Sequence, residues 1–423
     1  MEKTSAIIKL YEKGIDERLR IVQEFAKLTP EETGCLSKYG ALDYETANRM
    51  IENVIGTMQL PMGIATNFIV NGKEVLVPMA IEEPSVVAAA SNAAGLARPS
   101  GGFKADADEP IMIGQIQLVN FRNSESIVRR INENKKAILI LANQQDPTLV
   151  KFGGGAKDLE VRVLKYEGKE MVVVHLYVDV RDAMGANAVN TMAEAVAPMI
   201  EQFADLKVGM RIISNLATKR LARARAVWKK EDIKEETIDG ILNAYAFAAA
   251  DPYRAATHNK GIMNGIDAVV AATCNDSRAI EAGAHAYASI TGAYKPLTKY
   301  SKNENGDLVG EIELPMAVGL VGGATKSHPI AKIAVKILGV KTSKELAEII
   351  ASVGLAQNFA ALKALSTEGI QRGHMKLHSR NIAVTAGALG DEIEKVAAIL
   401  VKEGNVKVDR AKEVLDEIRK NVR

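Results

Sequence analysis

Alternating hydrophobic residues between about positions 110 and 217 constrain the fold of this 423-residue chain more than any other feature. Val172, Val174, Leu176, Val178 and Val180 occupy every second position, as the side chains of a half-buried strand do. Further strands are expected at 112–121, at about 159–163 and at 208–214, with helices at 124–141 and 185–203. The resulting order, β-α-β-β-α-β, is that of a split βαβ, ferredoxin-like module with an antiparallel sheet.

Helical patterns dominate the chain on both sides of this module. From Ile7 to Ile15 the apolar positions recur at helical spacing, and Thr29 and Asp43 are expected to cap two further helices. A strand pair is expected at about 294–315.

The patterns together predict an α+β protein. A large, mostly helical domain, residues 1–109 and 218–373, would receive the ferredoxin-like domain, residues 110–217, as an insertion. Residues 374–423 would form a small, mobile helical flap, with Asp391 and Asp409 opening two of its helices.

Composition excludes several classes of protein. The formal net charge of +2 provides no electrostatic footprint for nucleic acid. Two cysteines, Cys35 and Cys274, cannot form a disulfide framework and are typical of a reducing compartment. No signal peptide is recognised, and no apolar run reaches the ~18 residues of a membrane span. A soluble, cytoplasmic protein is therefore expected.

Residues suited to carbonyl chemistry gather between positions 252 and 285. Lys260 and Asn264 lie four residues apart, on one face of an expected helix, with Arg254 before them and Asp276 after them. Small residues surround these side chains, as at a site that a ligand approaches closely. A cation and an anion in a tight pocket stabilise a developing oxyanion and relay its proton. The plainer alternative is a solvent-exposed lysine.

Glu83-Pro84 precedes a segment, 85–97, that is apolar or small all round and is expected to form a helix buried on every side. A proline at the first helical position makes Glu83 the N-cap of that helix. A carboxylate at the mouth of a buried helix would carry a proton near neutral pH. The alternative is a surface carboxylate near a helix N-terminus.

Two further motifs are less specific. His374 and His378 have the spacing of a zinc-binding helix, but Met375 stands where the glutamate of that motif belongs, so a mobile proton donor or a solvated basic tail is the alternative. The glycine-rich segments match neither the dinucleotide nor the P-loop fingerprint. Asp182-Ala-Met-Gly185-Ala-Asn187 joins an expected strand to an expected helix, where backbone amides meet phosphates.

Six blocks, taken in order, resemble 3-hydroxy-3-methylglutaryl-CoA reductase in its soluble, prokaryotic class II form. They span residues from about 50 to 385 and read Glu52-Asn53-Val-Ile-Gly56, Glu83-Pro-Ser85-Val-Val-Ala, Asp182-Ala-Met-Gly-Ala-Asn187, Tyr253-Arg-Ala-Ala-Thr-His-Asn-Lys260, Asn275-Asp276-x-Arg278-Ala and Gly373-His-Met-Lys-Leu-His378-Ser-Arg-Asn381. The resemblance implies a four-electron reduction of a thioester to an alcohol with two reduced nicotinamide cofactors and no metal. It also implies an obligate homodimer with the active site at the subunit interface.

The resemblance assigns each candidate residue a role. The catalytic residues would be Glu83, Lys260, Asp276 and His378, with Asp276 orienting Lys260 and His378 protonating the departing CoA thiolate. The substrate-binding residues would be Ser85, Arg254 and Asn264. The cofactor-binding residues would be Asp146, Asp182, Met184, Gly185, Asn187 and Asn215.

Cofactor choice is predicted from Asp146, because a carboxylate accepts hydrogen bonds from a ribose 2′-hydroxyl and repels a 2′-phosphate. NADH is therefore expected as the preferred cofactor, with NADPH weaker. Three alternatives remain at this point: the same enzyme used to oxidise mevalonate, a zinc hydrolase using His374 and His378, and a non-catalytic CoA-binding homologue.

Overall fold

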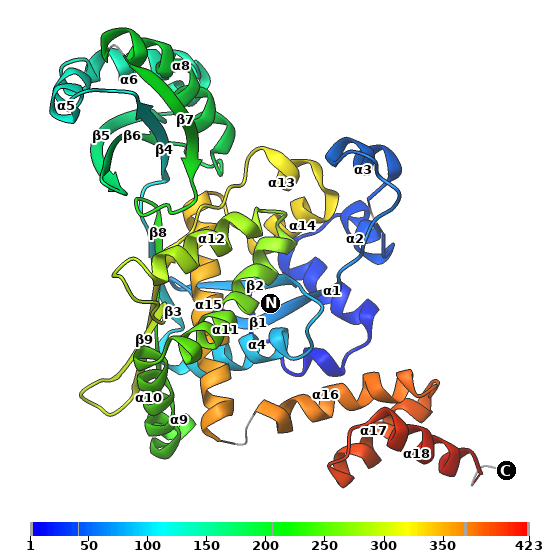
Figure 1. Cartoon of the computed structure of the whole chain (residues 1–423). Helices are drawn as coiled ribbons and strands as arrows, with labels where there is room; N and C mark the ends of the chain where they lie inside the picture. The colour runs from blue at the N-terminus through cyan, green and yellow to red at the C-terminus, as the bar shows by residue number, and fades with distance from the viewer. Residues whose placement is uncertain (1–2, 41, 205, 368–369, 421–423) are drawn as a thin grey trace.

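The computed structural model describes residues 3–40, 42–204, 206–367 and 370–420, and only the backbone from 370 to 377. It consists of a body built around one sheet, a smaller lobe with a second sheet, and a C-terminal group of helices at the edge of the body (Figure 1). A mixed helix and sheet architecture confirms the predicted fold class.

The body is built on a six-stranded sheet of order β2-β1-β3-β8-β10-β9. Strands β1 and β3 are parallel and all other neighbours are antiparallel. The sequence predicted the β9–β10 pair but none of the other four strands. The strands are β1 (Met62–Val70), β2 (Lys73–Ala80), β3 (Phe103–Ala107), β8 (Leu221–Trp228), β9 (Thr298–Lys302) and β10 (Leu308–Pro315).

Helix α15 (Ser343–Ser366) forms the centre of the body, where it packs against the sheet and the helices α4, α10 and α11. Trp228 of β8 stacks on Phe359 of α15 with the ring centroids 3.9 Å apart, and its Nε1–H donates to the carbonyl of Ala93 in α4. One indole thereby joins sheet and helices and satisfies its polar atom. The other helices of the body are η1 (Leu10–Glu12), α1 (Ile15–Ala26), α2 (Pro30–Ser37), α3 (Tyr44–Met50), α4 (Val86–Ala97), η2 (Arg98–Ser100), α9 (Lys230–Ile233), α10 (Glu235–Ala250), α11 (Pro252–Ala272), α12 (Ser277–Ala288), α13 (Gly323–Ser327) and α14 (Pro329–Leu338).

Two of the predicted helix starts are confirmed and the first helix is not. Thr29 forms a capping box with Glu32, and Asp43 accepts from the backbone N–H of Thr46. The helix expected from residue 7 is wrong, because α1 begins only at Ile15. Ser5 instead bonds to β1, where its carbonyl accepts from the N–H of Asn67, and the same carbonyl accepts from the N–H of Ile7.

Helix α4 forms where a buried helix was expected, with two corrections. Its N-cap is Ser85 and not Glu83. Its burial is one-sided: Ala90, Ala93 and Ala94 are buried, whereas Ala88 and Asn92 are exposed.

The smaller lobe confirms the predicted β-α-β-β-α-β order, with a four-stranded antiparallel sheet of order β5-β6-β4-β7. The alternating valines of β6, Val172, Val174 and Val178, are buried in the hydrophobic core. The elements are β4 (Ile111–Val119), α5 (Ser124–Glu133), α6 (Lys135–Gln144), α7 (Pro147–Lys151), β5 (Gly155–Tyr166), β6 (Lys169–Asp179), α8 (Ala186–Ala204) and β7 (Lys207–Ser214).

The C-terminal helices α16 (Ile370–Thr385), α17 (Asp391–Glu403) and α18 (Val408–Lys420) share a hydrophobic core of their own. Helix α17 begins at Asp391 as predicted, and α18 begins one residue before Asp409. The boundary expected at 373/374 falls inside α16, which runs through it as a continuous helix.

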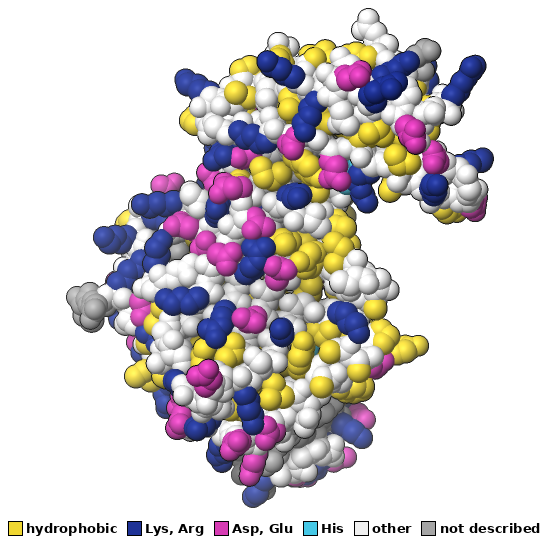
Figure 2. Space-filling model, turned by 90° about the vertical axis from the view of Figure 1, so that its left-hand side faces the viewer, with side chains coloured by type: hydrophobic (Ala, Val, Ile, Leu, Met, Phe, Trp, Pro, Cys, Tyr) yellow, Lys and Arg dark blue, Asp and Glu magenta, His cyan; other side chains and the backbone are white. Residues whose placement is uncertain are grey.

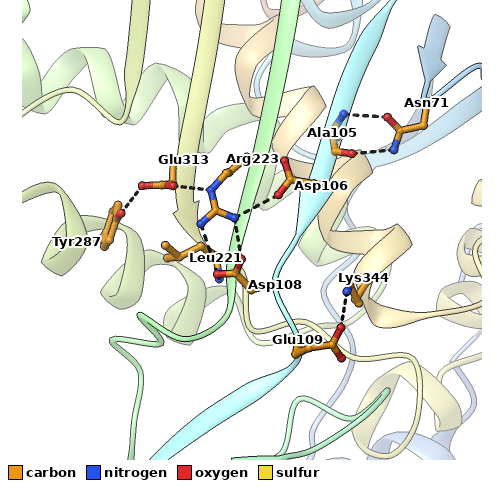
Figure 3. A network of polar contacts seen from close by, with 10 residues as sticks. All are labelled: Asn71, Ala105, Asp106, Asp108, Glu109, Leu221, Arg223, Tyr287, Glu313 and Lys344. Atoms are coloured by element: carbon orange, nitrogen blue, oxygen red, sulfur yellow. Dashed lines mark hydrogen bonds and ion pairs between the residues drawn. The ribbon is translucent and has the colours of Figure 1, made fainter.

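A polar network fixes the end of β3, from which the chain enters the smaller lobe (Figure 3). Arg223 of β8 reaches Asp106, Asp108 and Glu313, and the Tyr287 hydroxyl donates to Glu313. Burial, and then the bond to Glu313, raise the pKa of Tyr287 to about 12. Charge-assisted bonds thus hold the segment between β3 and β4, which leads into the smaller lobe, against the body.

Positive and negative side chains are interspersed over the face shown in Figure 2, as expected for a small net charge. Among the described helices, α15 alone is long and apolar enough to cross a membrane, which the sequence analysis did not anticipate. Two thirds of that segment (67%) is buried within the body, so α15 is a core helix here.

Candidate active site

One face of α11 carries three polar side chains in a row. Lys260, Asn264 and Asp267 follow one another at spacings of four and three residues, which places them on the same side of a helix. Asp251 caps the start of the helix by accepting from the N–H groups of Tyr253 and Arg254. Its N-terminal proline is compatible with this start.

This face of α11 opens into a cleft of about 570 Å³ between α11, α12 and the segment that follows β2. Pockets of this size hold small-molecule ligands. The residues that line it are Leu60, Ala80, Ile81, Glu82, Glu83, Lys260, Asn264, Asp267, Ala268, Ala271, Ser277, Arg278 and Glu281.

Lys260 and Glu83 meet in this cleft although 177 positions separate them in the chain. Lys260 Nζ lies 2.9 Å from Glu83 Oε2, and the Asn264 amide approaches the same carboxylate at 3.4 Å. The lysine side chain is 61% exposed and the glutamate 33% exposed, so the pair faces the open cleft. An ammonium beside a carboxylate supplies both a charge for an oxyanion and a site for its proton.

Ser85 stands at the start of α4 in a left-handed conformation, with φ of 80°. Its Oγ is buried, and among the described residues it has no hydrogen-bond partner. A strained residue with an unsatisfied hydroxyl is typical of a position kept for a ligand.

Asp276 is placed differently from the expectation that it orients Lys260. It caps α12 by accepting from the N–H of Ala279, and it forms an ion pair with Arg278 at 3.2 Å. Among the described residues, no hydrogen bond or ion pair joins Asp276 to Lys260. Lys260 pairs with Glu83 instead. Arg278, rather than Asp276, lines the cleft.

Arg254 lies on α11 but does not line the cleft. Burial lowers the pKa of its guanidinium. Burial, and then the charge of Arg254, also lower the pKa of nearby His258 to about 3. His258 is buried, and its Nε2 lies 2.6 Å from Thr298 Oγ1. It is therefore a neutral core residue rather than an acid or base.

The loop between β6 and α8 contains three of the predicted cofactor residues, Asp182, Met184 and Gly185. Gly185 has a φ of 103°, and a Cβ there would come within 2.5 Å of Val180, so only glycine fits. The free N–H groups at the start of a 19-residue helix suit a phosphate, as predicted for a dinucleotide. The Asp182 carboxylate is already engaged, because it accepts from the N–H of Ser343 at the start of α15.

The remaining predicted cofactor residues are dispersed. Asn187 and Asn215 are exposed at the first turn of α8 and just beyond β7. Asp146 caps the short helix α7 by accepting from the N–H of Leu149 at 2.8 Å.

The histidine motif lies on α16. His378 is exposed, takes part in an interaction and does not line the cleft, while the side chain of His374 lies outside the described residues. No group of three or more histidine, cysteine or acidic residues suited to a metal ion occurs within the described ranges.

Four residues of or near the site received no role from the sequence, although Arg278 belongs to one of the six blocks. They are Asp267, Arg278, Glu281 and Arg220. Asp267 was detectable, because it continues the helical spacing of Lys260 and Asn264. Arg220 carried no such signal, and its buried contacts with the β6–α8 loop depend on tertiary structure.

Comparison with known proteins identifies the family. The family model described as hydroxymethylglutaryl-coenzyme A reductase matches residues 14–379. A 3-hydroxy-3-methylglutaryl-coenzyme A reductase from Archaeoglobus fulgidus is 59% identical over 98% of this chain and 95% of that protein. A probable 3-hydroxy-3-methylglutaryl-coenzyme A reductase from Borreliella burgdorferi is 35% identical over 88% of this chain and 85% of that protein.

Solved structures agree with this result. A class II 3-hydroxy-3-methylglutaryl-CoA reductase from Streptococcus pneumoniae, bound to NADPH in open conformations, is 43% identical over 96% of this chain and all of that chain, with a TM-score of 0.82. A second structure from the same organism has a TM-score of 0.84 at 42% identity, covering 97% of this chain and 99% of that chain. The chain therefore belongs to the hydroxymethylglutaryl-coenzyme A reductase family of oxidoreductases, in its class II form.

Proposed function

We propose that this protein interconverts 3-hydroxy-3-methylglutaryl-CoA and (R)-mevalonate plus CoA by two successive hydride transfers. The observation that carries the proposal is the 2.9 Å contact of Lys260 with Glu83 beside Asn264 in the open cleft. Family membership supports the substrate, and the cation, acid and amide supply the groups that thioester reduction requires.

The proposed chemistry divides between charge stabilisation and proton transfer. The reduced nicotinamide supplies the hydride when it is bound. Lys260 stabilises the negative oxygen that forms on the former thioester carbon. Glu83, in its protonated form, gives a proton to the alkoxide as the aldehyde is reduced. His378 protonates the departing CoA thiolate when α16 closes toward the cleft.

Binding roles are proposed for the neighbouring polar side chains. Ser85, Arg254 and Asn264 would hold the carboxylate and hydroxyl of the acyl group, and the unpartnered Oγ of Ser85 supports this role. Asp276, at the start of α12, would keep Lys260 charged and oriented during the reaction. Asp182, Met184, Gly185, Asn187 and Asn215 would surround the cofactor.

NADH is the proposed preferred cofactor, although a relative from Streptococcus pneumoniae binds NADPH. Asp146 supports NADH, because its carboxylate would repel a 2′-phosphate. Asp146→Ala is expected to lower the ratio of kcat/KM for NADH to that for NADPH by roughly tenfold. A wild-type protein that already favours NADPH would contradict this assignment.

The protein is proposed to be a cytoplasmic homodimer. The two free cysteines support a reducing compartment. Exposed apolar side chains between α3 and β1, at Ile51, Ile55 and Met58, support coverage by a second copy. Use of the same site to oxidise mevalonate is the alternative direction, which growth on mevalonate would test.

The deciding experiment is a spectrophotometric assay of NADH oxidation with 3-hydroxy-3-methylglutaryl-CoA, with NADPH measured in parallel. The proposal expects substrate-dependent oxidation and the release of one thiol for every two cofactors oxidised. A purified, folded protein that oxidises neither cofactor with this substrate would overturn it.

A further inference from the structure

Asp267 is a second acid in the cleft that the proposed reaction leaves unassigned. It follows Lys260 by two turns on the same face of α11 and lines the same cleft as Glu83. Its Oδ1 is buried and has no hydrogen-bond partner among the described residues. A buried carboxyl oxygen without a partner is costly if it is ionised, so this position favours the protonated acid.

Glu281 of α12 lines the same cleft as Asp267, and the two carboxyl groups are close enough to interact. Two neighbouring carboxyl groups form a hydrogen bond only when one of them holds a proton. Burial first, and then the bond and charge of Glu281, raise the pKa of Asp267 to about 8. The pair therefore retains a proton at neutral pH, where an isolated aspartate has lost its own.

A chain of polar contacts leads from this pair toward solvent. Glu281 Oε2 lies 2.6 Å from His285 Nε2, and His285 Nδ1 lies 2.7 Å from the Tyr294 hydroxyl. The His285 side chain is 40% exposed, so it exchanges protons with water. An imidazole between a carboxylate and a hydroxyl is suited to proton transfer.

The other charged groups that line the cleft determine how readily this proton moves. They are Glu82 and Glu83 beyond β2, Lys260 on α11 and Arg278 on α12. Lys260 and Arg278 favour the ionised form of Asp267. The negative charges of Glu82, Glu83 and Glu281 favour its protonated form.

We propose that Asp267 and Glu281 form a proton relay that reprotonates Glu83 between hydride transfers. The relay rests on the proposed function, because each aldehyde reduced takes one hydride from the cofactor and one proton from Glu83. Asp267 then gives its O–H proton to the Glu83 carboxylate. The protonated His285 ring passes its Nε2 proton through Glu281 to Asp267, and water restores the proton on His285. The net exchange is one solvent proton for each alcohol formed.

Asp267→Asn tests the relay, because an amide keeps the shape but carries no transferable proton. The measurement is kcat for reduction of mevaldehyde by NADH between about pH 6 and pH 10. Wild-type kcat should fall as pH rises through about 8, where Asp267 loses its proton. The variant should lose this limb and retain roughly a tenth or less of the wild-type kcat, with little change in the KM for NADH.

Glu281→Gln is the second variant, and it also serves if Asp267→Asn fails to fold. Removing the neighbouring negative charge lowers the pKa of Asp267, so the alkaline limb should move to lower pH. Glu311→Gln is the matched control, because Glu311 forms an exposed ion pair with Arg225 on the sheet and does not line the cleft.

The outcomes separate the relay from the function on which it rests. An active wild-type protein whose pH profile Asp267→Asn and Glu281→Gln leave unchanged overturns the relay alone. A loss that appears equally in Glu311→Gln also overturns it. A folded wild-type protein that reduces neither mevaldehyde nor the acyl-CoA overturns the proposed function, and the relay with it.

Discussion

Lys260 bears the positive charge on which the proposed reduction depends, and its surroundings make it removable without loss of the fold. Its side chain is 61% exposed, and its recorded partner, Glu83, is also accessible to water. Lys260→Ala is expected to lower kcat by roughly 10³ or more, because the oxyanion loses its cation. Stability should change by less than about 0.5 kcal/mol, since the ion pair is solvated.

Measurements of kcat and of the thermal unfolding of Lys260→Ala check this prediction. Lys299, which lies exposed on β9, provides the matched control, and Lys299→Ala should retain full activity. A Lys260→Ala protein with more than a tenth of wild-type kcat would remove the lysine from the chemistry.

Individual residues of the site differ in how far the sequence alone predicts their contacts. The helical spacing of Lys260 and Asn264 was readable directly, and their common face is present in α11. The meeting of Glu83 with Lys260 was not readable, because it depends on how β2 and α11 pack. The contacts of Asp276 were not readable either, because its ion pair with Arg278 and its capping of α12 depend on where that helix begins.

At the scale of elements, Arg220 holds the β6–α8 loop against the body. The residue is 4% exposed, and its guanidinium donates to the carbonyls of Ala183, Met184 and Val318. Burial lowers its pKa to about 10, and it remains charged at neutral pH. Gly319 packs so closely that a Cβ there would lie 2.4 Å from the N of Met184.

Arg220→Met is therefore expected to act on the cofactor loop and on stability together. Three carbonyls lose a charged donor, which lowers the melting temperature by several degrees. The loop loses its fixed position, so the KM for the cofactor should rise more than the KM for the acyl-CoA. Arg225→Met, at an exposed ion pair of the strand β8 that follows Arg220, should change neither KM. Equal changes in both KM values would mean that Arg220 acts on the whole fold only.

Strand prediction succeeded in the lobe and failed for four of the six strands of the body, for a physical reason. In β6 the alternating positions are mostly valines, which favour strands. In β8 the buried positions include Ala222, Ala224 and Ala226, and the intervening arginines complete a pattern that also occurs in helices. The pairing of β8 with β3 and β10, which are distant in sequence, decides the outcome.

The contact between β2 and η2 gives the body a measurable pH dependence. Burial pushes the pKa of Glu74 upward, but hydrogen bonds from Arg98 and Ser5 outweigh it and lower the pKa to about 2. The folded pKa lies below the unfolded value, so this stabilisation is complete above about pH 4.5 and is lost as pH falls toward 2.

Glu74→Gln should accordingly destabilise the protein at neutral pH, and the difference from wild type should shrink as pH falls from about 4.5 to 2. Denaturant unfolding of both proteins at several pH values measures it. Glu45→Gln, at an exposed pair with Arg49, is the control and should show little difference at any pH. A constant gap between Glu74→Gln and wild type would contradict the proposed cause.

At the scale of the whole molecule, the segment between α3 and β1 is where a second copy in the proposed homodimer is expected to pack. Ile51, Ile55 and Met58 are exposed there, and Leu60 at its end lines the cleft. A second copy that covers these side chains would also approach the active site. Ile55→Asp combined with Met58→Lys should therefore convert a dimer to a monomer, because charges replace the buried apolar contact.

Light scattering after gel filtration measures the mass, and the NADH assay measures activity on the same fractions. NADH oxidation is expected to decrease as the fraction of dimer decreases, because the cleft would lose the surface that the second copy provides. Ile8→Asp is the control, because Ile8 is equally apolar and exposed but lies outside this segment. A double variant that stays dimeric would place the interface elsewhere, and a monomer with full activity would show that one chain completes the site.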